Sequence, residues 1–210
     1  MNDLFSKIAT AGLLTFAINT YPAMAQTQIG EIPAPSVPKI IEAPEGNFAF
    51  LRAQAEGTQN YVCVYTSGGY AWKLSGPQAT LFISFRWING DVRQQISTHF
   101  LSPNPQEEGT ARATWQSSDT SMIWAKAQET SSDPAFVAQG AIPWLLLKVM
   151  GAKTGPTGGN FLSSATYLQR ISTTGGVMPA SGCSTEAEIG TTMFVPYTAE
   201  YVFYKERKKL

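Results

Sequence analysis

The chain has 210 residues, of which 43% are hydrophobic and 14% charged, and its fifteen basic side chains balance fifteen acidic ones. This length favours one domain, because all-β sandwiches and barrels often reach such a size undivided. The low charged share is typical of β-rich exported proteins. The neutral balance argues against nucleic acid as a partner, since binding to phosphates needs clustered Lys and Arg.

Residues 1–25 have the three parts of a secretory signal peptide. Lys7 precedes an apolar run from Ile8 to Ile18, and Ala23-Met24-Ala25 ends the segment with small residues. The run is too short for a transmembrane anchor, which needs roughly 17 to 25 apolar residues. We therefore expect cleavage after Ala25 and an exported mature chain, periplasmic or secreted, without a transmembrane segment.

Residues 26–44 contain Pro33, Pro35, Pro38 and Pro44. Proline at this density blocks the hydrogen bonds of a sheet and favours extended backbone. This segment is predicted to be a Pro-rich linker or a surface-hugging arm, and residues 45–210 to be the β-rich domain.

From Phe48 onward the hydrophobic period is mostly two, as in half-buried strands. Turns are predicted at Gly68-Gly69, at Gly76-Pro77 and at Asn89-Gly90, the last being the strongest short-range hairpin signal. Residues 142–148 fit either a short helix or a buried strand, and a bulge is expected near Pro196. The pattern predicts an all-β fold: a single-domain antiparallel β-sandwich or barrel with at most one or two short helices.

Cys63 and Cys183 are the only cysteines. In an exported chain two cysteines most economically form one disulfide, which here would close a loop of about 120 residues. The alternative, a redox or catalytic thiol, would be favoured by a CxxC spacing, which the sequence lacks. We predict a structural Cys63–Cys183 bridge.

Several motifs resemble the family known as domain of unknown function 3455. The similarity covers about residues 45 to 204 in the family's order, including Gly57–Cys63, Trp72–Leu74, Thr98–Phe100, Ile142–Leu146, Tyr167–Pro179 before Gly182-Cys183, and Val195–Tyr204. The resemblance implies an exported bacterial or fungal protein with no established activity. Residues 102–112 depart from the family pattern, because the segment between the His and the next Trp looks longer here than is usual in the family.

Some fungal members of that family carry a malate dehydrogenase label. The sequence does not support that activity here, because no G-x-G-x-x-G follows a strand and no βαβ alternation could hold a dinucleotide. No cofactor is expected.

His99 is the only histidine, so a His-rich zinc site is excluded and no metal is expected. A serine triad would need His99, yet the chain has no G-x-S-x-G motif. His99 with a nearby carboxylate such as Asp119 remains the candidate pair for a small hydrolase or isomerase. The other interpretation is a hydrogen-bonded structural histidine, and whether His99 is buried or opens into a pocket would distinguish them.

Three further residues are candidate binding groups. Arg170 lies in a predicted strand, where it either binds an anion or is tied to structural partners, with Glu200 as one expectation. Trp115 and Trp124 are candidates for stacking against a sugar or an apolar ligand, whereas Trp72 and Trp144 are expected in the core. The sequence thus favours a non-catalytic exported module that binds a small molecule, a glycan or a protein.

Overall fold

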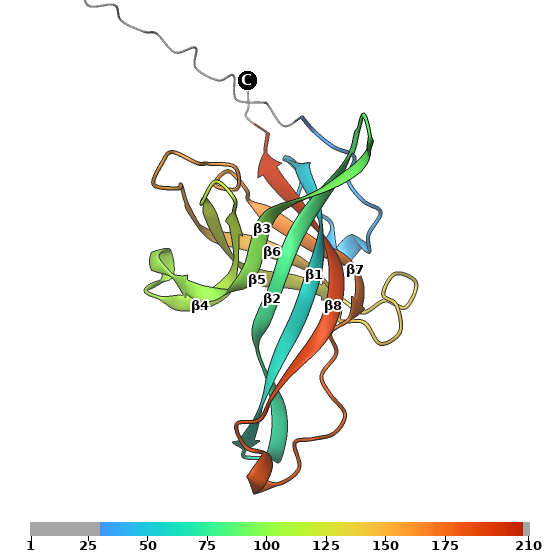
Figure 1. The fold of residues 1–210 in the computed structure, drawn as a ribbon, viewed down its shortest axis with the longest axis vertical. Helices are drawn as coiled ribbons and strands as arrows, with labels where there is room; N and C mark the ends of the chain where they lie inside the picture. The colour runs from blue at the N-terminus through green and yellow to red at the C-terminus, as the bar shows by residue number, and fades with distance from the viewer. Residues whose placement is uncertain (1–29, 208–210) are drawn as a thin grey trace, which may run out of the picture.

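A computed structural model describes residues 30–207 and shows eight antiparallel strands closed into a barrel (Figure 1). Each strand pairs with the next, and β8 pairs with β1. The described residues contain no α-helix, only the short 3-10 turns η1 (Lys39–Ile41), η2 (Pro105–Glu107) and η3 (Glu186–Glu188). The predicted all-β class is confirmed, and the barrel form follows from the β1–β8 pairing. The strands are β1 (Asn47–Thr66), β2 (Gly69–Trp87), β3 (Gly90–Asn104), β4 (Thr110–Ser117), β5 (Met122–Ser131), β6 (Trp144–Lys153), β7 (Tyr167–Gly175) and β8 (Thr192–Glu206).

The first two strands are longer than the sequence indicated. The turn predicted at Gly76-Pro77 is wrong, because both residues lie inside β2, opposite Asn60 and Gln59 of β1. Gly76 has a φ of 138°, and the β1–β2 register shifts beside it. β3 pairs with β2 only from Ala79 onward, so Pro77 lies where β2 has a free edge, a position that tolerates proline.

Beyond the barrel, β1, β2 and the start of β8 continue as an extension that we call the arm (residues 59–76 and 178–195; Figure 1). The predicted disulfide is confirmed and lies in this arm, with 5.4 Å between the Cα atoms of Cys63 and Cys183. Cys63 is fully buried beside Tyr61 and Trp72. The bridge therefore fixes the segment between β7 and β8 onto β1.

A second extension is the hairpin formed by β2 and β3 around the predicted Asn89-Gly90 turn. Trp87 pairs with Gly90, so the two central residues are Ile88 and Asn89, one position earlier than the motif suggested. The tip leaves Trp87 60% exposed and Ile88 93% exposed. β1 does not pair with β2 beyond Phe82, so this hairpin projects alone.

Alternation along the strands divides inward from outward side chains. Tyr197, Ala199, Tyr201 and Phe203 of β8 lie in the main core inside the barrel.

The expected bulge near Pro196 is wrong. The register shift lies instead on β7, between Ile171 and Thr174, where Ser172 has a φ of 50°.

In the ambiguous segment 142–148, residues 144–148 form the start of strand β6 rather than a helix, and Ile142 and Pro143 precede the strand. Its residues pair with β5 on one side and with β7 on the other. Leu146 packs in the cluster outside the barrel and Leu147 in the main core, so both faces of the strand are buried. Burial on both faces removes the period-two signal, which explains why the sequence alone could not distinguish strand from helix.

Residues 30–44 lie against the outer face of the barrel. Ile32 N–H donates to the Ala49 carbonyl at 2.9 Å, and the fully buried Ile41 belongs to an outer cluster with Ile171 and Val202. The signal peptide of residues 1–25 and its cleavage after Ala25 fall outside the described residues. Among residues 30–207, no helix is long and apolar enough to cross a membrane.

Candidate functional site

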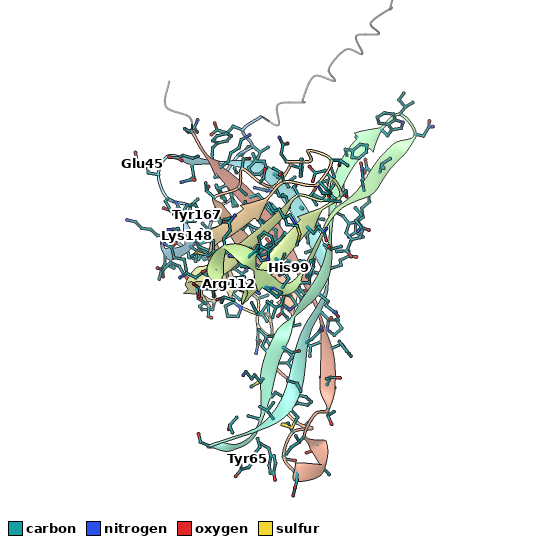
Figure 2. All side chains as sticks on the ribbon, turned by 90° about the vertical axis from the view of Figure 1, so that its left-hand side faces the viewer. Glu45, Tyr65, His99, Arg112, Lys148 and Tyr167 are labelled. Carbon is teal, nitrogen blue, oxygen red and sulfur yellow. A yellow bond between two sulfur atoms is a disulfide. The ribbon has the colours of Figure 1, made fainter. Side chains whose placement is uncertain are left out.

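His99 points into the barrel from β3. The side chain is only 3% exposed, and its Nδ1 donates to the Thr114 carbonyl at 2.9 Å. Burial lowers the pKa of His99 to about 3, and the hydrogen bond to Thr114, which raises it, is the weaker effect. The imidazole is therefore neutral at neutral pH. In Figure 2 it lies in the barrel body, away from Tyr65 at the tip of the arm.

Asp119, the proposed partner of His99, lies in the turn between β4 and β5. Its carboxylate accepts from Ser121 N–H at 3.0 Å, from Ser121 Oγ at 2.6 Å and from Phe161 N–H at 2.8 Å. Burial raises the pKa of Asp119, but these hydrogen bonds lower it by more. The carboxylate joins this turn to the segment before β7. Within residues 30–207, no hydrogen bond or ion pair connects it to His99.

The two candidate tryptophans are both buried. Trp115 stacks on His99 inside the barrel, whereas Trp124 donates from Nε1 to Ser102 Oγ at 2.8 Å. Neither ring is exposed for stacking against a ligand from solvent. Trp72 and Trp144, expected in the core, are buried in the arm and in the outer cluster respectively.

Residues 102–112 form the end of β3, the turn η2 and the start of β4. Asn104 is fully buried, and Glu107 forms a two-point ion pair with Arg112, with both distances at 2.8 Å. Gln106 Nε2 donates to the Ala152 carbonyl of β6. These contacts make the segment an ordered hairpin.

Arg170 points toward the barrel interior from β7. Leu168, two residues earlier, is in the main core, while Ile171 belongs to the outer cluster. Arg170 Nη2 donates to the Pro143 carbonyl at 2.8 Å. The expected tie to Glu200 is wrong, because Glu200 lies on the outer face, where it pairs with Arg52 at 3.5 Å. Alternation in β8 puts Tyr201, not Glu200, opposite Arg170.

Three tyrosines lie close enough to the guanidinium for its charge to affect their pKa values. Burial raises the pKa values of Tyr61, Tyr197 and Tyr201, and the positive charge of Arg170 opposes each rise. The hydroxyls of Tyr197 and Tyr201 are 3.5 Å apart, and Tyr61 donates to the Gly176 carbonyl at 2.7 Å. Gln59 adjoins this group, because a Cβ on Gly176 would lie 2.9 Å from Tyr197 Cβ and 3.1 Å from Gln59 Cγ. We call Gln59, Tyr61, Arg170, Tyr197 and Tyr201 the arginine–tyrosine cluster.

The loop between β5 and β6 closes over this cluster. Ala141 bridges to Gly176, Ile142 N–H donates to the Gly175 carbonyl at 2.9 Å, and Thr173 Oγ1 donates to the Ile142 carbonyl at 2.6 Å. The same loop supplies Pro143, the acceptor for Arg170. A hollow of about 480 Å³ opens in this loop, lined by Ser132, Pro134, Val137, Ala138, Gln139 and Ala141.

Hydrogen-bond donors exceed acceptors around Arg170. Arg170 Nε, Gln59 Nε2 and Trp115 Nε1 are buried and have no hydrogen-bond partner among the described residues. In the same part of the chain, each ion pair uses another arginine, so no carboxylate lies within 4.0 Å of the Arg170 guanidinium. Buried polar groups are nearly always paired, so several unpaired donors beside one charge need a specific explanation.

Sequence reasoning identified Arg170 and Trp115 but missed Gln59, Tyr61, Tyr197 and Tyr201. The available signal was the spacing of Tyr197 and Tyr201, which puts both rings on the inward face of one strand. No cluster of three or more His, Cys, Asp or Glu residues that could hold a metal occurs within residues 30–207.

The fold defines a class: an eight-stranded antiparallel barrel with a disulfide-bonded arm and a polar, tyrosine-lined region where the two join. Residues 44–205 match the family described as protein of unknown function (DUF3455), so the chain belongs to that family, as its motifs predicted. The match extends from just before β1 almost to the end of β8. No curated protein and no solved structure matches the chain.

Proposed function

We propose that this domain is an exported, non-catalytic module that binds a small ligand at the arginine–tyrosine cluster. The observation that carries the proposal is the group of buried donors without acceptors around Arg170. A buried donor without a partner costs about 1 to 3 kcal/mol, so a fold that keeps several together has a reason to do so. A ligand that supplies acceptors would satisfy them.

The protonation, burial and contacts of His99 support a non-catalytic role. The imidazole is neutral, buried and stacked on Trp115, and it donates to a backbone carbonyl. Those are the contacts of a structural histidine. The alternative, a hydrolase or isomerase using His99 with Asp119, gains no supporting contact, because that carboxylate is engaged by Ser121 and Phe161.

Export is part of the proposal. The leader pattern of residues 1–25 predicts it, and a disulfide within one domain is what an oxidising compartment favours. N-terminal sequencing of the protein from periplasmic and medium fractions tests this. A mature chain beginning at Gln26 is expected, and a chain that retains Met1 in the cytoplasm would contradict export.

Ligand binding is tested on the mature domain by a thermal-shift screen with small acids, amides, sugars and apolar compounds. We expect at least one class to raise Tm in a dose-dependent way and to remain chemically unchanged after incubation. Tyr197→Phe and Tyr201→Phe should weaken that binding, whereas Tyr65→Phe at the exposed end of the arm should not. Binding that is unaffected by both inner substitutions would place the site elsewhere, and conversion of a compound would contradict a non-catalytic role.

A further inference from the structure

The charge of Arg170 is the feature that limits what the cluster can bind. The guanidinium is half-buried, it donates to the neutral Pro143 carbonyl and lies beside the Tyr201 hydroxyl, and Nε–H has no acceptor within the described residues. A buried charge is costly unless an opposite charge or a full set of hydrogen bonds compensates it. Arg170 has neither, so the site has a net positive charge and spare donors.

The neighbouring groups add donors rather than acceptors. Either of Tyr197 and Tyr201 donates to the other, so one O–H proton of the pair has no acceptor among the described residues. Gln59 Nε2 and Trp115 Nε1 are likewise unpaired, and the Trp115 ring lies 5.4 Å from that of Tyr201. The contacts link these groups from Gln59 through Gly176 and Tyr197 to Tyr201 and Trp115. A cationic ligand is disfavoured in such surroundings.

We propose that the group recognised at the arginine–tyrosine cluster is an oxyanion, the carboxylate or phosphate of a small organic ligand, held by the Arg170 guanidinium. The planar fork of an arginine matches two oxygens of such a group, and hydrogen bonds between charged partners are about twice as strong as neutral ones. The hydroxyl of the Tyr197–Tyr201 pair and the Gln59 amide would supply further donors. This inference rests on the proposed function and adds the ligand's charge.

Size is limited by the packing around the cluster. A Cβ added at Gly176 would crowd Tyr197, Gln59 and Ile142, so the packing there argues against a large ligand and restricts the inference to a small headgroup. The loop between β5 and β6, which holds Pro143, packs against this part of the cluster. Aromatic rings on several sides favour a ligand whose remainder is apolar or flat.

The test compares succinate and inorganic phosphate with succinamide, which matches succinate in size but carries no charge. The probe is the Arg170 Nε–H resonance in a ¹H–¹⁵N spectrum of the mature wild-type domain, assigned by its loss in Arg170→Lys. We expect succinate or phosphate to shift this resonance in a saturable way and to raise Tm, and succinamide to do neither. Succinate alone would identify a carboxylate site, and phosphate alone a phosphate site.

Arg170→Gln should weaken oxyanion binding about tenfold to a hundredfold, the loss expected for a hydrogen bond to a charged group. The matched control is Arg52→Gln, on the outer face beside Glu200, which should bind as the wild type does. Because the resonance is followed in the wild-type protein, the test stands even if Arg170→Gln folds poorly. Equal binding of succinamide, or no response to either anion, overturns the oxyanion inference. A neutral compound that binds at Tyr197 and Tyr201 would in that case leave the proposed function standing.

Discussion

His99 and Trp115 face each other across the β3–β4 ladder with their rings nearly parallel, 4.0 Å between centroids and 9° between planes. Tyr201 packs edge-on against both rings, at 5.3 Å from His99 and 5.4 Å from Trp115. The only histidine of the chain is thus a neutral packing element inside the barrel, next to the region where donors are in excess.

The free energy of unfolding should fall as pH decreases below the ordinary pKa of histidine. The unfolded imidazole binds a proton below about 6.5, whereas in the folded barrel His99 does so only near 3. The unfolded state binds more protons between these values, so stability decreases by up to about 1.4 kcal/mol per pH unit. Urea unfolding at several pH values between about 7 and 5 measures the slope of the unfolding free energy against pH. This range lies above the pH values at which most carboxylates titrate. His99→Gln should flatten the slope, and an equal slope in the variant would contradict the prediction.

Glu107 should remain ionised in acid. The hydrogen bonds from Arg112, followed by that from Asn104, hold the pKa of the Glu107 carboxyl at about 2. Because this pKa is depressed, its contribution to stability is present above the unfolded value near 4.5 and is lost as pH falls toward 2. NMR titration should find this low value, and Arg112→Gln should raise it. Arg93→Gln is the matched control, because Arg93 pairs with Glu56 and should leave the pKa of Glu107 unchanged.

Removing the disulfide should loosen the arm. Cys63 and Cys183 are separated by 120 residues, and loss of a native bridge of this kind costs about 2 to 5 kcal/mol. Cys63→Ala with Cys183→Ala should lower Tm, and hydrogen exchange should increase most around Trp72 and Ser181. Oxidised and reduced wild-type protein provide the comparison. If both forms melt alike, the bridge does not support the fold.

Gly57 should not tolerate a side chain. A Cβ there would lie 2.0 Å from the Gln78 carbonyl oxygen and 2.5 Å from Ala79 Cα, both backbone atoms of β2. Gly57→Ala must separate the strands, at an expected cost of about 1 to 3 kcal/mol. Gly68→Ala is the matched control, because its Cβ would meet nothing closer than 3.8 Å, and it should stay within about 0.5 kcal/mol. Equal denaturation midpoints for the two variants would contradict the close approach.

Gln169 should anchor the N-terminal segment to the barrel. Its amide donates to the Ile41 carbonyl and accepts from the Tyr204 hydroxyl, both at 2.6 Å in buried surroundings. Gln169→Leu leaves two buried groups without partners, each costing about 1 to 3 kcal/mol. The variant should have a lower Tm than the wild type, and proteases should cleave it faster near Ile41. Gln54→Leu removes an exposed bond to Glu200 and should change neither.

The local pattern of the chain was enough for the strands, the disulfide partners and the family. Period-two alternation marked β1, because a strand with one buried face records its orientation in every second residue. It failed at Gly76-Pro77, where turn-forming residues lie inside a long strand with a free edge, and at β6, where both faces are buried.

By itself the sequence determined that this protein is a β-rich, disulfide-bonded member of its family, since composition, alternation and cysteine count act within short stretches or need no geometry. Only the tertiary structure decided that the sheet closes into a barrel, that Arg170 faces Tyr201 rather than Glu200, and that Gln59, Tyr61 and Tyr197 join them. Those residues come from β1, β7 and β8, and the first of these strands is more than 100 residues from the other two. The register between strands, which no single strand encodes, sets which side chains meet.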